Sequence, residues 1–172
     1  MKFIAGKNLV LIGFMGTGKT EVGTILANKL IRKMLDTDQL IAEREGMSVA
    51  EIFICRGEAY FRERESELAE ELSLQKELVV STGGGIVLNS RNIELLRING
   101  FIVWLDAECS DLIQRLAGDK TRPLLSKDDK EKEIVKLYKE REHLYRQACD
   151  LHVDTTGRTP LTVSDDILKM LH

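Results

Sequence analysis

Apolar residues gather along the chain in five short runs, each separated from the next by a longer segment with helical spacing. The runs are rich in Val, Ile and Leu, and most show no clear alternation of apolar and polar residues. Strands of this kind are typical of a parallel sheet that helices cover on both faces. We therefore predict strands at residues 9–12, 33–37, 78–82, 101–106 and 151–154.

Between the runs, apolar residues recur every three or four positions, as Val22, Leu26 and Leu30 do. This spacing places them on one face of a helix. The predicted helices span residues 19–30, 48–75, 89–98, 110–116, 130–148 and 161–171. Alternating strands and helices indicate an α/β open sheet with right-handed crossovers. Because no repeat or low-complexity linker divides the sequence, we expect one domain over residues 1–172.

The composition narrows the class of protein. With 172 residues, 43% of them hydrophobic, the chain is long enough to bury a core without metal or disulfide support. Its 25 basic and 28 acidic residues give a net charge of −3, whereas a dedicated nucleic-acid-binding protein is usually more basic. Cys55, Cys109 and Cys149 are odd in number and far apart, which favours reduced thiols in the cytosol. No apolar stretch reaches the roughly 20 residues that cross a bilayer. We expect a cytoplasmic protein with neither a nucleic-acid nor a membrane partner.

A phosphate-binding motif follows the first predicted strand. Residues 13–20 read GFMGTGKT and match G-x-x-x-x-G-K-S/T at each fixed position, between a strand and an amphipathic helix. The glycines let backbone N–H groups turn inward toward phosphate, and the helix N-terminus adds partial positive charge. Lys19 is then expected to reach the β- and γ-phosphates, and the Thr20 hydroxyl to bind Mg²⁺. The alternative is a glycine-rich turn that only links strand to helix, and such a turn would need neither Lys19 nor Thr20. The sequence also lacks the guanine-specifying N-K-x-D motif of GTPases, which favours ATP.

Two carboxylates close the second predicted strand. Asp36 and Asp38 would point the same way on an extended chain, at the edge of the sheet where ligands of such folds bind. One of them could help to hold hydrated Mg²⁺, and the other could accept a proton from an attacking hydroxyl. Alternatively, Asp38 caps a helix. The pattern alone does not decide between these interpretations.

Three glycines, Gly83, Gly84 and Gly85, end the third predicted strand. Such a run has a high entropic cost unless the backbone turns sharply or approaches another group closely. A flexible turn is one interpretation, and a backbone that faces a ligand is the favoured one.

Arg141 falls inside an apolar stripe at helical spacing, formed by Ile134, Leu137, Tyr138, Leu144, Tyr145 and Ala148. An inward guanidinium needs an anionic partner, because a buried and unpaired charge is costly. A structural Asp or Glu could serve, and so could a ligand carboxylate or phosphate.

The other candidate arginines carry weaker signals. Arg62 lies on a helix rich in acids and could form an ordinary surface ion pair. Arg122, before Pro123 and beside the charged run 126–132, is either a mobile arginine that closes over a transferring phosphate or a plain loop residue. Arg115 and Arg158 are uninformative individually. His143, His152 and His172 have no metal-binding spacing.

Taken together, these motifs resemble the shikimate kinases. The shared elements are residues 13–20, the Asp-Thr-Asp of 36–38, GEAYFR at 57–62, the three glycines, RPLL at 122–125 and REHLY at 141–145, in the family's order and spacing. The resemblance implies a three-layer P-loop kinase fold of the nucleoside-monophosphate-kinase type, with a five-stranded parallel sheet of order 2-3-1-4-5. It also implies a helical substrate-binding segment at about 37–65, a lid at about 117–130 and a monomer.

The activity implied by the resemblance is ATP-dependent phosphorylation of the 3-hydroxyl of shikimate, in aromatic amino-acid biosynthesis. A kinase of another small polyol acid, such as gluconate, and a catalytically silent nucleotide-binding regulator are the alternatives. A regulator would be expected to have lost Lys19, Asp38 or Arg122, and all three are present.

The resemblance assigns three sets of roles. Asp38, Lys19 and Arg122 would be catalytic, and Asp38, Arg62, Gly83, Gly84 and Arg141 would bind shikimate, with the two arginines on its carboxylate. ATP would be bound by Gly16, Thr17, Gly18, Lys19, Thr20, Glu21, Arg115, Arg122 and Arg158. Thr20 would bind Mg²⁺ directly and Asp36 through water.

Overall fold

A computed structural model of the chain describes residues 5–118 and 129–171. Five parallel strands form one sheet in the spatial order β2-β3-β1-β4-β5, which confirms the predicted order. The strands are β1 (Asn8–Ile12), β2 (Met34–Asp36), β3 (Val79–Ser81), β4 (Gly100–Asp106) and β5 (Leu151–Asp154). Each prediction located a strand, with no end displaced by more than one residue.

The described ranges contain seven α-helices and one short 3₁₀ helix, of which all but the last helix lie between strands in the chain. They are α1 (Lys19–Leu30), α2 (Thr37–Glu45), α3 (Val49–Ser73), η1 (Ile86–Leu88), α4 (Ser90–Ile98), α5 (Cys109–Leu116), α6 (Lys130–Ala148) and α7 (Pro160–Met170). Among these residues, no helix combines the length and apolar character needed to cross a membrane.

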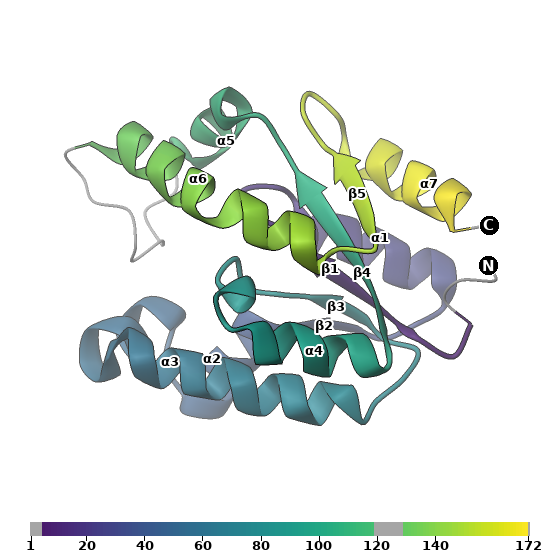
Figure 1. Ribbon diagram of the computed structural model, residues 1–172, viewed down its shortest axis with the longest axis horizontal. Coiled ribbons are helices and arrows are strands. Elements are labelled where there is room, and N and C mark those ends of the chain that lie inside the picture. Colours follow the sequence, from purple (N-terminus) through teal and green to yellow (C-terminus); the bar gives the residue numbers. More distant parts are fainter. Residues whose placement is uncertain (1–4, 119–128, 172) are drawn as a thin grey trace.

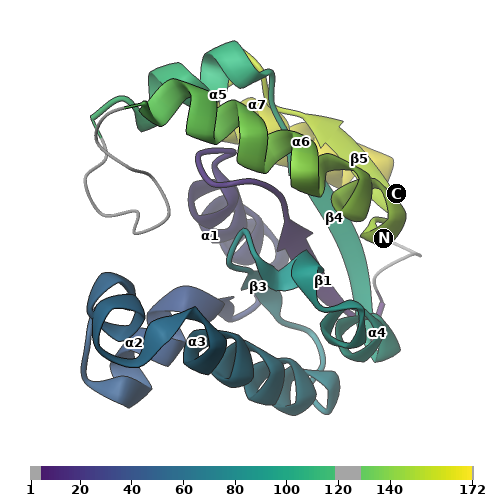
Figure 2. The ribbon, with the colours of Figure 1, turned by 60° about the vertical axis from the view of Figure 1, so that its left-hand side comes forward.

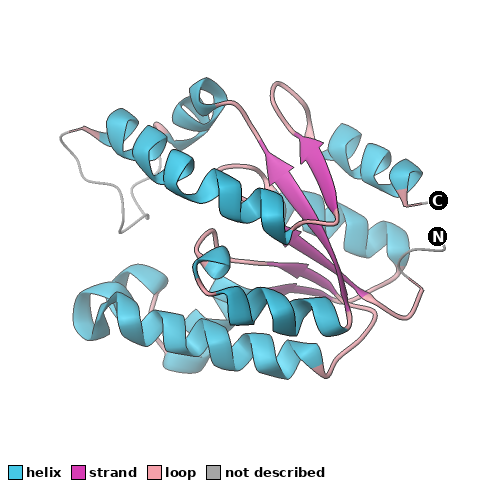
Figure 3. Ribbon diagram, in the orientation of Figure 1, coloured by secondary structure: helices cyan, strands magenta, loops and turns pink. Residues whose placement is uncertain are grey.

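Helices cover both faces of the sheet, as the apolar strands predict. On β1, Leu9 and Leu11 face a cluster that includes residues of α1 and α7. The alternate residues Val10 and Ile12 face the opposite cluster, to which α3, α4, α5 and α6 contribute. Figures 1 and 3 show the strands lying between these two helical layers. Successive side chains of a strand point to opposite faces, so the apolar residues of the central strands are divided between the two halves of the core.

The segment after β2 differs from the prediction. The strand is shorter than 33–37, and a helix, α2, begins at Thr37. Only Thr37 and Ile41 of its nine residues are buried, so α2 has no apolar stripe by which its sequence could be detected. The predicted helix 48–75 corresponds to α3 but is interrupted at Gly57, where φ is 84° and ψ is 165°. That conformation is readily adopted only by glycine.

The carboxyl ends of the parallel strands collect the loops that carry the conspicuous motifs. The loop between β1 and α1, the start of α2 and the glycines after β3 all lie at this edge of the sheet. In Figure 2, the α2–α3 pair lies below the central strands, and α5 and α6 lie above them. Residues from both helical groups thus meet at one edge, the usual ligand site of such sheets.

Candidate active site

The loop between β1 and α1 packs tightly against the end of β4. A Cβ atom on Gly13, where φ is 144°, would lie 2.1 Å from the backbone oxygen of Leu105, so only glycine fits there. Lys19 Nζ donates hydrogen bonds of 2.8 Å to the carbonyls of both Gly13 and Phe14. The Thr17 hydroxyl donates to the Phe14 carbonyl, also at 2.8 Å. The lysine ammonium is thus held over a closed loop at the start of a helix, a geometry suited to phosphate.

A cleft of about 560 Å³ opens over this loop. It brings together most of the residues singled out in the sequence, from both sides of the strand edge. Those that line it are Gly16, Thr17, Gly18, Lys19, Thr20, Glu21, Asp36, Asp38, Gly83, Gly84, Arg115 and Arg158.

Oxygen ligands for a hard cation meet in one wall of the cleft. The Thr20 hydroxyl donates to Asp36 Oδ2 at 2.8 Å and lies 3.4 Å from the Ser81 hydroxyl. Mg²⁺ usually takes one or two protein oxygens and completes its shell with water and phosphate, which this group fits. Ser81, at the end of β3, was not among the predicted ligands. Within residues 5–118 and 129–171, no three His, Cys, Asp or Glu side chains form a metal-binding group, so a protein-only cage is absent there.

The sequence suggested that Asp36 and Asp38 point the same way from an extended strand. This prediction is wrong, because α2 begins at Thr37, between the two residues. Asp36 ends β2 and caps α2, with its Oδ1 accepting from the backbone N–H groups of Asp38 and Gln39 at 3.1 and 3.2 Å. The capping residue is therefore Asp36, and Asp38 lies in the first helical turn. The Asp38 carboxylate packs closely on Gly83 after β3, whereas Asp36 bonds to the start of α2 and to Thr20.

A second, smaller pocket adjoins the cleft. It shares Asp38, Gly83 and Gly84 with the cleft, so the two spaces meet at these residues. Its remaining lining residues are Met15, Val49, Phe53, Phe61, Arg62, Glu65, Gly85 and Arg141. A cavity with apolar walls and two arginines suits a small organic acid.

The three glycines are explained by close approach. A Cβ on Gly83 would lie 2.3 Å from Asp38 Oδ1, and one on Gly85 would lie 2.2 Å from Nη1 of Arg62. The corresponding position on Gly84 is 3.3 Å from the backbone nitrogen of Met15, in the phosphate-binding loop. Each glycine therefore admits a different group of the site against the bare backbone. That this backbone also faces a ligand, the favoured interpretation of the sequence, stays a prediction.

The two arginines of the small pocket differ in how they are paired. Arg62 forms ion pairs with Glu58 at 2.8 Å and with Glu65 at 2.5 Å. Arg141 is 5% exposed, which confirms that it lies on the inward face of α6, and it donates a long hydrogen bond of 3.4 Å to the Gly84 carbonyl. Among the described residues, no carboxylate forms an ion pair with Arg141. A buried guanidinium without an ion pair favours the binding of an anion in the pocket.

Sequence reasoning missed Glu65. It is 1% exposed, and its carboxylate pairs with Arg62. Burial raises the pKa of Glu65 to about 7, an effect that the charges of Arg62 and Arg141 oppose and the Asp38 carboxylate reinforces. Its position three residues after Arg62 on a helix is a pairing signal. The several other acids of the same helix obscured that signal.

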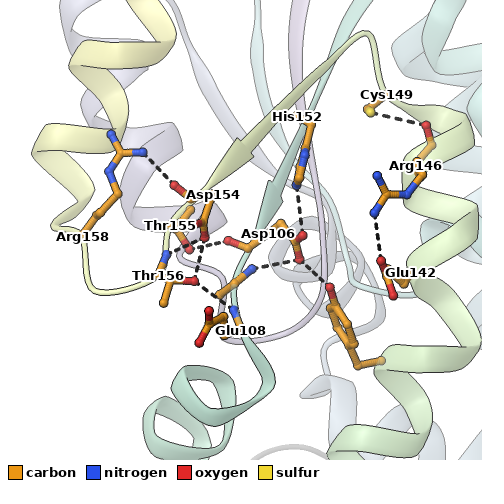
Figure 4. A network of polar contacts seen from close by, with 12 residues as sticks. Asp106, Glu108, Glu142, Arg146, Cys149, His152, Asp154, Thr155, Thr156 and Arg158 are labelled. Atoms are coloured by element: carbon orange, nitrogen blue, oxygen red, sulfur yellow. Dashed lines mark hydrogen bonds and ion pairs between the residues drawn. The ribbon is translucent and has the colours of Figure 1, made fainter.

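Two further arginines border the cleft on its β5 side. Arg115 donates to the Gly16 carbonyl at 3.1 Å and to the Thr155 carbonyl at 2.7 Å, which ties the phosphate-binding loop to the segment after β5. Arg158 donates to the Asp154 carbonyl at 2.8 Å (Figure 4) and pairs with Asp166 of α7. Both guanidinium groups are therefore held in place beside the cleft.

Arg122 and most of the lid expected at about 117–130 lie outside the described residues.

Comparisons with known proteins agree with this geometry. A family model described as shikimate kinase matches residues 15–172. A shikimate kinase from a Sulfurihydrogenibium species is 46% identical over 165 residues, covering 96% of this chain and 98% of that protein. The solved structure of a shikimate kinase from Acinetobacter baumannii in complex with shikimate superposes with a TM-score of 0.93 at 36% identity, covering 99% of this chain and 95% of that one. A gluconokinase from Sinorhizobium meliloti, at 14% identity and a TM-score of 0.59, shares the fold alone.

Proposed function

The chain belongs to the shikimate kinase family, and from this premise we propose how its residues transfer the terminal phosphoryl group of ATP to the 3-hydroxyl of shikimate, giving shikimate 3-phosphate and ADP. One observation carries the proposal. The cleft over the phosphate-binding loop and the arginine-lined pocket share Asp38, Gly83 and Gly84. A hydroxyl bound in the pocket would therefore meet a phosphate bound in the cleft at Asp38.

At the acid end, Arg141 and Arg62 bind the carboxylate of shikimate. The buried guanidinium of Arg141 supplies a charge that no described carboxylate neutralises by an ion pair. Arg62, already oriented by Glu58 and Glu65, supplies the second set of donors. Two planar guanidinium groups that bind one carboxylate fix both its position and its orientation. Gly83 and Gly84 let the ring lie against the backbone.

Asp38 stands where the two ligands meet, and it orients the 3-hydroxyl and accepts its proton. Its carboxylate packs on Gly83, where a Cβ would come within 2.3 Å. The side chain is thereby aimed along the boundary of the two pockets, which both contain it. Phosphoryl transfer depends mainly on such positioning and on charge stabilisation.

At the phosphate end, the loop amides of Gly16, Thr17 and Gly18 bind the phosphates, and Lys19 neutralises charge on the transferred group. Lys19 would exchange its carbonyl partners in the loop for phosphate oxygens, which are the stronger acceptors. Arg122 adds a second positive charge from the lid. Glu21, Arg115 and Arg158 complete the nucleotide site, with the two arginines beside the adenine.

Thr20 and Asp36 are the residues that would hold Mg²⁺, and the adjacent Ser81 hydroxyl supports the same position. When bound, the cation neutralises phosphate charge. The Asp36 carboxylate is oriented for this by its two bonds to the start of α2.

We further propose that residues 1–172 act as a single kinase domain, cytoplasmic and monomeric, with a substrate-binding segment at about 37–65 and a lid at about 117–130. Closure of the lid would exclude water and so limit hydrolysis of ATP.

A panel of acceptors tests the function. With Mg-ATP, the release of ADP is measured in a coupled assay with shikimate, with gluconate and without acceptor. We expect rapid turnover with shikimate only, because two arginines and a compact apolar pocket suit a cyclic acid. Preference for gluconate would support the polyol-acid alternative, and nucleotide binding without turnover would support a regulator.

The same assay tests the role of Asp38. Asp38→Asn keeps the shape of the side chain but removes its charge and basicity. Turnover should fall by about 10²-fold, the usual scale of general-base help, while nucleotide affinity stays the same. A near-normal rate would exclude an essential carboxylate at this position.

A further inference from the structure

One face of α6 carries three polar side chains toward the site. Tyr138, Arg141 and Tyr145 are spaced by three and four residues, which aligns them on the same side of a helix. Arg141 and Tyr145 are buried, and Tyr138 is half-buried. The arginine is thus bracketed by two tyrosines along the helix axis.

Tyr145 joins Arg141 to the glycines after β3. Its hydroxyl donates a 2.5 Å hydrogen bond to the Gly84 carbonyl, which also accepts the long bond from Arg141. The Arg141 guanidinium lies close enough to the Tyr145 hydroxyl to lower its pKa, against the larger raising effect of burial. The Tyr145 ring stacks on Trp104 of β4, with 6.0 Å between centroids, which fixes the hydroxyl in place.

Tyr138 secures the other side of Arg141. Its hydroxyl donates to Asp106 Oδ1 at 2.8 Å, and its ring meets Phe14 of the phosphate-binding loop edge-on at 5.8 Å. Asp106 is itself held at the end of β4 by the Ala107 N–H at 2.9 Å and by His152 Nε2 at 3.0 Å. Figure 4 shows Asp106 at the centre of these contacts. Helix α6 is therefore fastened to the sheet edge at a point one turn before Arg141.

We propose that Tyr138 and Tyr145 are positioning residues, which hold Arg141 in the orientation that binds the carboxylate of the substrate. The inference rests on the proposed function. An arginine side chain has several rotatable bonds, and ordering it on binding costs affinity. The guanidinium of Arg141 forms no ion pair with a described carboxylate, so its orientation depends on α6 and on the Gly84 carbonyl, which the Tyr145 hydroxyl also bonds.

Tyr138→Phe and Tyr145→Phe test this role, because each keeps the ring and removes the hydroxyl. The dissociation constants of shikimate and of its neutral carboxamide are measured by calorimetry, together with that of ATP. We expect shikimate to bind about 2- to 12-fold more weakly to each variant, the effect of one hydrogen bond. Affinity for the carboxamide and for ATP should be unchanged, because neither ligand depends on a charge at Arg141.

A double-mutant cycle separates positioning from a general structural role. In an Arg141→Ala background, neither tyrosine substitution should weaken shikimate binding further. Tyr60→Phe is the matched control, since its hydroxyl bonds to Glu45 at 2.9 Å and lines neither pocket. It should leave the ratio of shikimate to carboxamide affinity unchanged.

Three results would overturn the proposal: equal losses for shikimate and the carboxamide, losses that persist without Arg141, or no loss at all. If a thermal melt shows that Tyr145→Phe is not folded, the binding measurements on Tyr138→Phe alone test the proposal. Wild-type protein that does not bind shikimate would reject the proposed function, and that outcome is distinct from a failure of the tyrosine variants.

Discussion

Apart from Arg122, the groups that would meet phosphate are backbone amides and one lysine from a single stretch of eight residues. The small pocket is instead lined by side chains from α2, α3 and α6, as well as by the glycines after β3. The phosphate end is thus built by local chain geometry. The acid end exists only after distant elements have packed together. This difference governs how each end can be detected in a sequence and how each should respond to substitution.

Electrostatic pairing differs in the same way. Lys19 is held by two carbonyls of its own loop, and Arg62 by two carboxylates of its own helix. Arg141 donates to the Gly84 carbonyl, which lies outside its helix and also accepts a hydrogen bond from Tyr145 of the same helix. We therefore expect substitutions at the phosphate end to affect turnover, and those at the acid end to affect binding of the acid.

The largest effect is expected for Lys19→Ala. Removing a charge that is aimed at the transferred phosphoryl group should lower kcat by about 10³-fold, as the loss of a preorganised donor does elsewhere. Shikimate binding, measured by calorimetry without nucleotide, should be unchanged because Lys19 does not line the small pocket. An equal loss of shikimate affinity would mean that the two ends are not separable.

Arg141→Ala addresses the other end. Removing a buried guanidinium that binds a carboxylate should weaken shikimate binding by at least about 30-fold, the lower range for breaking such a pair. ATP affinity should stay near the wild-type value, since Arg141 does not line the cleft. Titration calorimetry with each ligand measures both, and equal losses of the two affinities would contradict the assignment.

The difference in construction also explains what could be predicted. The central strands β1, β3 and β4 carry apolar residues on both faces, and the phosphate-binding motif is contiguous, so local patterns sufficed for them. The strand order needed the family resemblance, and so does the ligand carboxylate proposed as the partner of Arg141. The apolar pattern alone did not predict α2, because only Thr37 and Ile41 of it are buried; the resemblance implied a helical segment there. Glu65 was missed because one buried acid cannot be distinguished by sequence from its exposed neighbours.

Glu65 makes the stability of the acid end depend on pH. Its folded-state pKa of about 7 lies above the usual 4.5 of a glutamate, so the folded protein binds more protons than the unfolded chain between these values. The free energy of unfolding should therefore fall as pH rises from about 5 to 7, by up to about 1.4 kcal/mol per pH unit from this group.

Urea denaturation at each pH would measure this slope. Glu65→Gln keeps the shape and removes the titration, so its slope across the window should be smaller than that of the wild type. Identical slopes for the two proteins would show that another group titrates in this range. Glu51→Gln serves as the control, because the pKa of Glu51 is lowered by its bonds to Ser48 and so lies below the window.

The smallest and most selective effect is expected from a pair of glycine substitutions. Gly13→Ala places a methyl group 2.1 Å from the backbone oxygen of Leu105, at a φ of 144° that side chains rarely adopt. Since backbone cannot move aside cheaply, this variant should lose at least about 1–3 kcal/mol of stability.

Gly85→Ala instead meets the end of the Arg62 side chain at 2.2 Å, where φ is not positive. A flexible side chain can shift, so stability should change little while shikimate affinity falls by about 2- to 12-fold, the scale of one hydrogen bond. Thermal melts and calorimetry on both variants measure the contrast. A large loss of stability in Gly85→Ala would mean that Arg62 is held as rigidly as the backbone of the phosphate-binding loop, and the two ends of the site would then not differ in construction.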